Sequence, residues 1–100
     1  MRVISKRTLR RFWEGHPRGA TAKAALEAWH GQVLDADWAQ PSDVKKQYRD
    51  ASILKGSRVV FNIAGNRYRL VVRINYPYRV VYVRFVGIHA EYDRIDAETV

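Results

Sequence analysis

The stretch Asn66–Tyr76, NRYRLVVRINY, alternates between two kinds of side chain. One parity is apolar and consists of Tyr68, Leu70, Val72 and Ile74. The other parity carries Arg67, Arg69, Val71 and Arg73. Successive side chains of a β-strand point to opposite faces, so this spacing predicts a strand with one apolar and one basic face. A chain with such a strand must build a sheet that buries one side and presents arginines on the other.

Two neighbouring segments share the period of two. RVVFNI and the strand above flank Ala64-Gly65-Asn66, a short turn that predicts a β-hairpin. The segment YPYRVVYVRFVGIHAEY supplies a third strand, in which Gly87 is expected to end the strand or form a bulge. On this strand we expect the buried face to hold Val81, Val83 and Phe85. The opposite face would then hold Val80, Tyr82 and Arg84.

The N-terminal half shows the spacing of helices instead. A short strand is predicted at Arg2–Ile4, with Ser5 as the N-cap of a helix through KRTLRRFWE. The segment GHPRG stops this helix, and TAKAALEAWHGQVLDA forms a second one. Its apolar stripe is spaced four, three and four residues apart, at Ala22, Leu26, Trp29 and Val33. Ser42, after Pro41, is predicted to cap a short third helix, DVKKQYRDA.

These segments predict one α+β domain over residues 1–100. A chain of 100 residues buries a single small core. The expected architecture is two or three helices on one face of a twisted antiparallel sheet of three to five strands, with the other face partly open. The three tryptophans are expected in the core, at Trp13, Trp29 and Trp38.

The charge of the chain favours a polyanionic partner. The formal net charge is +8, and Ala51 to Ala90 contains seven basic residues and no Asp or Glu. The candidate RNA-binding residues in this region are Lys55, Arg58, Arg67 and Arg84. Arg10 and Arg11, on the first helix, are further candidates for contact with an RNA backbone. The alternative is that these cations only solvate the surface, although a solubilising surface normally mixes both signs.

Several function classes are excluded or disfavoured by composition. The chain has no cysteine, which removes disulfides and thiolate sites. His16, His30 and His89 lack the spacing of metal ligands, and there is no glycine-rich phosphate loop, so we expect no metal and no cofactor. No apolar run is long enough for a membrane span, and the N-terminus lacks an apolar signal region. We therefore expect a cytoplasmic protein.

The segment VGIHAEYDRID carries the candidate proton-transfer groups. His89 and Tyr92 are three residues apart and would project to one side of a helical turn. Histidine is the natural general acid or base near neutral pH, and an arginine-rich setting would lower the pKa of a tyrosine. Without a metal, RNA can be cut by its own 2′-OH. Arg69, with Arg73 and Lys55, would stabilise the charged phosphorane while His89 and Tyr92 move protons.

A family resemblance supports this reading. Three runs of this sequence resemble HigB-type toxins of bacterial type II toxin–antitoxin systems, within the RelE/ParE superfamily. They are WAQPSDVKKQYRDASIL, RVVFNIAGNRYRLVVRINY and VYVRFVGIHAEYDRID. The resemblance covers nearly the whole chain. It implies a RelE-like fold and a metal-independent endonuclease that cuts mRNA in the ribosomal A site. It also implies neutralisation by a helix-turn-helix antitoxin of the HigA type.

The resemblance also assigns residues. The strand arginine of the superfamily matches Arg69, its C-terminal catalytic aromatic matches Tyr92, and the basic or imidazole residue before it matches His89. Ile88 departs from the pattern, because similar sequences often have a small polar residue there. Two alternatives stay open: a ParE-like topoisomerase inhibitor, and a basic module that binds RNA or a partner without cutting. A DNA-binding architectural protein is disfavoured, since no recognition helix is evident.

Overall fold

The computed structural model describes all residues from 1 to 100. The strands are β1 (Arg2–Ile4), β2 (Ser52–Ile53), β3 (Arg58–Ile63), β4 (Tyr68–Asn75) and β5 (Val80–Ile88). The α-helices are α1 (Lys6–Gly15), α2 (Lys23–Leu34), α3 (Pro41–Gln47) and α4 (His89–Tyr92), and the short 3-10 helix η1 covers Ala20–Ala22. The α+β fold predicted from the sequence is confirmed.

The five strands form one sheet in the order β1-β5-β4-β3-β2. The predicted hairpin is present, and β4 also pairs antiparallel with β5. In one respect the expectation of an antiparallel sheet was wrong, because β1 pairs parallel with β5. No hairpin joins these two strands. The long connection through the helices and the rest of the sheet brings them together, and such a crossover permits parallel pairing.

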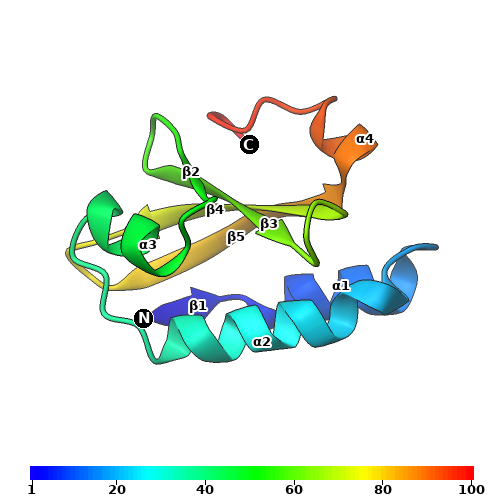
Figure 1. Cartoon of the computed structure of the whole chain (residues 1–100), viewed down its shortest axis with the longest axis horizontal. Coiled ribbons are helices and arrows are strands. Elements are labelled where there is room, and N and C mark those ends of the chain that lie inside the picture. The colour runs from blue at the N-terminus through cyan, green and yellow to red at the C-terminus, as the bar shows by residue number, and fades with distance from the viewer.

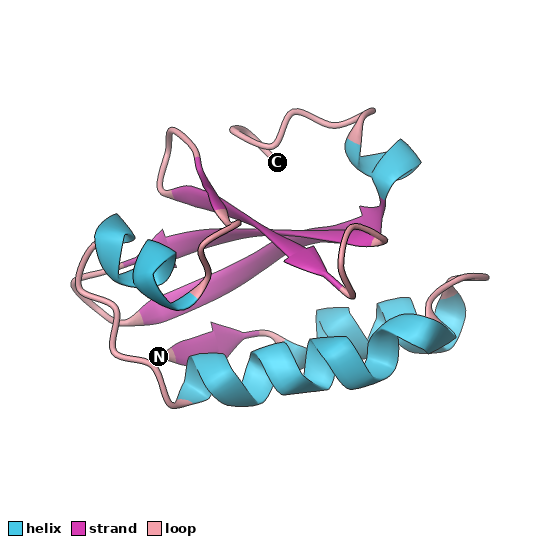
Figure 2. Ribbon diagram, in the orientation of Figure 1, coloured by secondary structure: helices cyan, strands magenta, loops and turns pink.

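The helices cover one face of the sheet, as predicted. In Figure 1 and Figure 2, α1 and α2 lie side by side beneath the sheet. The apolar parity of β4 is buried against them, with Tyr68 3% exposed and Leu70 and Val72 fully buried. The same core holds the three tryptophans and Val44 of α3. Burial of about twenty apolar side chains supplies the main driving force for folding, at roughly 25 cal/mol per Å².

The second face of the sheet is more covered than expected. The segment after α4 runs back across it (Figure 1), and Val60, Val71 and Ala97 form a second small core. The partly buried side chains around this core are Leu54, Phe85, Tyr92, Ile95 and Val100. Val71 interrupts the row of arginines on β4. Because it is apolar, its burial beneath Ala97 of the C-terminal segment is favourable. The arginine face is therefore divided by an apolar patch.

A β-bulge places Phe85 of β5 on the face opposite to the one predicted. The register between β4 and β5 shifts between Val71, which pairs with Phe85, and Val72, which pairs with Val83. The extra residue moves Phe85 to the second core, whereas Val81 and Val83 pack on the helical side as predicted. The bulge does not lie at Gly87, and β5 continues through this glycine to Ile88.

The helix starts differ from the sequence prediction in detail. Ser5 precedes α1 as predicted, but its side chain caps no backbone N–H. α3 begins at Pro41 rather than after Ser42, and the side chain of Asp43 accepts a hydrogen bond from the Ala39 N–H (2.9 Å). Proline suits the first helical position because its missing N–H would be unsatisfied there. No helix has the length and apolar character needed to cross a membrane.

Candidate functional site

Arg69 and His89 meet where β4 passes the end of β5. The guanidinium Nη2 of Arg69 donates a hydrogen bond to Nδ1 of His89 (3.1 Å). Its Nη1 donates to the main-chain oxygen of Asn66 (3.1 Å), in the turn that precedes β4. The arginine is thus fixed at both ends of its fork before any ligand arrives. A phosphate that binds both Nη atoms would have to replace these contacts.

The contact with Arg69 determines which nitrogen of His89 carries a proton. An arginine can only donate, so Nδ1 accepts and the proton of the neutral ring lies on Nε2. This Nε2 lies 3.4 Å from Oδ1 of Asp93, one helical turn further along the chain. The His89 side chain remains 57% exposed. It can therefore reach a ligand from solvent while Arg69 and Asp93 limit its rotation.

Glu91 fixes the start of α4, the helix that carries His89. Its Oε1 accepts a hydrogen bond from the Ile88 N–H (2.9 Å), and its Oε2 accepts one from Nε2 of His16 (3.0 Å). The hydrogen bond from the Ile88 N–H and the contact with His16 hold the pKa of Glu91 below its usual value, against a smaller opposing effect of burial. Ile88 occupies the N-cap and has no polar side chain to cap the helix. The Glu91 carboxylate instead accepts the hydrogen bond of the Ile88 N–H at the start of the helix.

Gly87 leaves room for this arrangement. A Cβ atom at this position would stand 2.6 Å from Cζ of Phe85 and 2.9 Å from Oε1 of Glu91. Both distances are shorter than van der Waals contact allows. The glycine that the sequence suggested as a strand end instead permits the Glu91 carboxylate to fold back over β5.

Tyr92 lies on α4 beside the second core. Its ring packs against the cluster of Val60, Val71 and Ala97. The hydroxyl makes no hydrogen bond within the protein, to His89, Arg69 or any other residue. α4 places both candidate residues on one helical turn, as predicted, but only His89 is held against the strand arginine.

The other candidate cations make no hydrogen bond to His89. Arg73 is exposed and pairs in register with Tyr82 of β5 and Arg58 of β3. Arg58 and Arg84 both donate to the main-chain oxygen of Val100 (2.9 and 3.2 Å). The N–H of Lys55 points at Glu98 (3.4 Å). The C-terminal segment therefore contacts three of these candidate cations, Lys55, Arg58 and Arg84.

Arg10 and Arg11 are not part of this face. Both are exposed on α1, which packs on the opposite side of the sheet. Any role of these two residues belongs to a separate surface.

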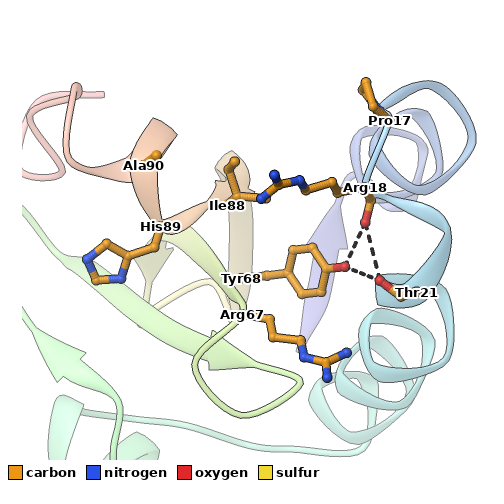
Figure 3. Close-up of a pocket in the computed structure, with 8 residues that line it drawn as sticks. All are labelled: Pro17, Arg18, Thr21, Arg67, Tyr68, Ile88, His89 and Ala90. Carbon is orange, nitrogen blue, oxygen red and sulfur yellow. Dashed lines mark hydrogen bonds between the residues drawn. The ribbon is translucent and has the colours of Figure 1, made fainter.

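A pocket of about 550 Å³ opens on the other side of His89 (Figure 3). Its lining residues are Pro17, Arg18, Thr21, Arg67, Tyr68, Ile88, His89 and Ala90. The hydroxyl of Tyr68 donates to the main-chain oxygen of Arg18 (2.6 Å) and also contacts the Thr21 hydroxyl. These contacts tie the loop between α1 and α2 to the start of β4 and so form one wall of the pocket.

Three features of this site were not predicted from the sequence. They are the His16–Glu91 contact, the Arg18–Thr21 wall and the Glu91 carboxylate at the start of α4. His16 and Glu91 are 75 residues apart, and no periodic pattern links them. No group of three or more metal-ligating side chains lies together anywhere in the chain.

Comparison with known proteins shows the family of this chain. The family model of the HigB toxin, described as a RelE-like toxic component of a toxin–antitoxin system, matches residues 22–95. The mRNA interferase HigB of Escherichia coli O6:H1 is 24% identical over 97 residues, which cover 95% of this chain and 91% of that protein. The matched segment contains Arg69, His89 and Tyr92. The chain therefore belongs to the HigB family, the RelE-like toxic components of toxin–antitoxin systems.

Proposed function

We propose that this toxin is a metal-independent endoribonuclease that cuts mRNA on the ribosome, in the A site, and so inhibits translation. The observation that carries the proposal is the hydrogen bond from Arg69 to His89. It pairs a fixed cation with a group that can transfer a proton near neutral pH. The similarity to a protein named mRNA interferase supports the same activity.

In the proposed reaction, the 2′-oxygen of one nucleotide attacks the adjacent phosphorus. The bond from phosphorus to the 5′-oxygen of the next nucleotide breaks, which leaves a cyclic phosphate and a free 5′-hydroxyl. One proton leaves the 2′-hydroxyl and another reaches the departing 5′-oxygen. Nδ1 of neutral His89 has a lone pair, directed at Arg69 in the free protein, and can accept the first proton once the arginine turns to phosphate.

The remaining residues serve this reaction in distinct ways. Arg69 stabilises negative charge on the non-bridging phosphate oxygens, because its fork can make two parallel hydrogen bonds to them. Tyr92 donates the second proton. Arg73 is the next exposed cation along β4. Its positive charge helps to stabilise the negative charge of the reacting phosphate. Asp93 orients the His89 ring from the side opposite Arg69.

The cations around this centre provide affinity for the RNA backbone. Lys55, Arg58, Arg67 and Arg84 extend the positive surface around the reacting group, and Arg10 and Arg11 offer a second contact on the far side of the molecule. As the toxic component of a toxin–antitoxin system, the chain has an antitoxin partner. We propose an antitoxin of the HigA type, with a helix-turn-helix domain.

The test is mRNA cleavage in a purified translation system. Wild type is compared with His89→Ala and Tyr92→Phe at equal concentration, and the cut sites are mapped by primer extension. EDTA is tested separately on free RNA, because ribosomes themselves need magnesium. We expect cuts in ribosome-bound mRNA with wild type and a loss of about 10²- to 10⁴-fold in each variant.

A folded wild type that cuts no RNA, with or without ribosomes, would contradict the proposal. The basic sheet would then bind without cutting, and topoisomerase assays would follow. Cleavage on the ribosome that both variants retain in full would keep the nuclease and reject the assigned residues.

A further inference from the structure

The pocket on the helical side of His89 has no role in the reaction described above. We propose that it binds one RNA nucleotide, the neighbour of the cleaved bond, with the base against its apolar wall and a phosphate on Arg18. This inference rests on the proposed nuclease function for the identity of the RNA. The binding itself can be tested independently of cleavage.

The charge of the pocket favours an anionic ligand. Arg18 and Arg67 line it, and no aspartate or glutamate does. Neither guanidinium makes a hydrogen bond or ion pair within the protein, since the four ion pairs involve other residues. In the view of Figure 3, the Tyr68 ring lies between these two arginine side chains. Each guanidinium can bind a phosphate through charge-assisted hydrogen bonds on its own side of the ring, and that of Arg18 lies beside Ile88 of the apolar wall.

The remainder of the lining favours a flat, partly apolar group. Pro17, Ile88 and Ala90 contribute apolar surface, and Thr21 and His89 contribute polar atoms. The volume of about 550 Å³ falls within the range of small-molecule sites. A nucleotide combines these properties, because it joins an aromatic base to a phosphate. An inorganic anion would use the arginines and leave the apolar wall exposed.

The position of His89 places this nucleotide next to the cleaved bond. His89 binds Arg69 through its imidazole and is also one of the residues that line the pocket. In Figure 3 its ring points away from Tyr68 and Thr21, so the imidazole stands at the edge of the pocket. An RNA strand whose phosphate reaches Arg69 therefore passes the rim of the pocket. The pocket can select among bases, while the arginine face contacts only the backbone and carries no sequence information.

One wall of the pocket comes from the loop between α1 and α2. Pro17, Arg18 and Thr21 precede the segment 22–95 that matches the HigB family model. The loop that holds them is anchored by the Tyr68 hydroxyl and by the Arg18 N–H, which donates to Nδ1 of His16 (3.0 Å).

The experiment titrates the ¹⁵N- and methyl-labelled full chain with RNA trinucleotides that carry 2′-O-methyl groups. These cannot be cut because the attacking hydroxyl is blocked. We expect chemical-shift changes at Ile88, Ala90 and Thr21. Arg18→Ala should weaken the binding constant about tenfold, whereas the matched control Arg49→Ala, an exposed arginine outside the pocket, should leave it within about twofold.

Inorganic phosphate is titrated in parallel. Equal affinity for phosphate and trinucleotide would overturn the nucleotide assignment, as would the absence of shifts at the pocket residues at millimolar RNA. The cleavage assay then separates the two proposals. Cleavage without pocket shifts overturns the subsite alone. Pocket shifts that depend on Arg18, in a protein that cuts no RNA, support the binding site and overturn the nuclease.

Discussion

His16 donates a hydrogen bond through Nε2 to Oε2 of Glu91 (3.0 Å), across 75 residues of sequence. The other carboxylate oxygen accepts from the Ile88 N–H, so one glutamate joins the loop after α1 to the first turn of α4. His89 is the first residue of that helix. The position of the candidate general base therefore depends on a contact with a loop on the other side of the sheet.

The first prediction concerns this contact and pH. The pKa of Glu91 is lowered in the folded state, so its stabilising contribution is present above the unfolded value of 4.5 and is lost as pH falls through the lower folded value. Glu91→Gln should cost about 1 kcal/mol of unfolding free energy near neutral pH, because the amide cannot satisfy both donors. Urea midpoints measured from about pH 6 to pH 3 should fall less steeply in the variant than in wild type.

Glu14→Gln is the matched control, because Glu14 is exposed on α1 and makes no contact. Its pH profile should follow that of wild type. Equal acid sensitivity of wild type and Glu91→Gln would show that Glu91 does not anchor α4.

The second prediction separates the strand arginines. Arg69→Ala should lower mRNA cleavage by about 10²- to 10³-fold and relieve growth arrest, because it removes the cation held against His89. Arg69→Lys should recover only part of the activity, since an ammonium cannot make the paired hydrogen bonds. Arg73→Ala should have a smaller effect, as Arg73 makes no contact with His89. Cleavage rates at saturating ribosome concentration give the comparison, and circular dichroism checks the fold.

If Arg73→Ala lost more cleavage activity than Arg69→Ala, the reacting phosphate would have to be assigned to Arg73 instead of Arg69. Full toxicity of Arg69→Ala at equal expression would remove this arginine from the site.

The periodic spacing of apolar residues predicted the helices and strands that bury one face. The alternation in β4 predicted the buried face of Tyr68 and Leu70, and the spacing in α2 predicted Leu26 and Trp29, because burial on one face imposes a period. The sequence predicted that Arg69 and His89 act on one phosphate, and a hydrogen bond joins them in the structure. The antiparallel pairs β3–β4 and β4–β5 place the end of β5, and with it His89, beside the start of β4.

The parts that depend on one contact between distant segments escaped prediction. The bulge between Val71 and Val72 changes the face of Phe85 without a glycine or proline to mark it. The C-terminal segment covers Val71 through Ala97, an alanine with no periodic neighbours. Tertiary packing decides such features, and no local period encodes them.

The third prediction tests whether Tyr92 acts by its hydroxyl or by its ring. Tyr92→Phe keeps the ring against Val60 and Val71, so the unfolding free energy should change by less than about 0.5 kcal/mol. Tyr92→Ala should cost about 1–3 kcal/mol, because it empties part of the second core. If the hydroxyl transfers a proton, cleavage should fall about 10²- to 10⁴-fold in both variants. Urea unfolding and ribosomal cleavage, measured on the same preparations, separate the two effects.

Full cleavage by Tyr92→Phe would assign the residue to packing alone. Another group would then have to protonate the leaving oxygen.

The fourth prediction concerns the second basic surface. Arg10 and Arg11 lie on α1, away from the arginines of β4. If they contact ribosomal RNA, the double variant Arg10→Ala/Arg11→Ala should weaken ribosome binding and reduce the slope of log affinity against log salt by about 1.4 to 1.8, since each phosphate contact adds about 0.7 to 0.9. Cleavage at saturating ribosome concentration should stay unchanged, because neither residue approaches His89. Lys46→Ala/Arg49→Ala removes the same charge from exposed positions at and beyond the end of α3 and is the control. An equal change of slope in both double variants would mean that net charge, and not a contact of α1, governs the association.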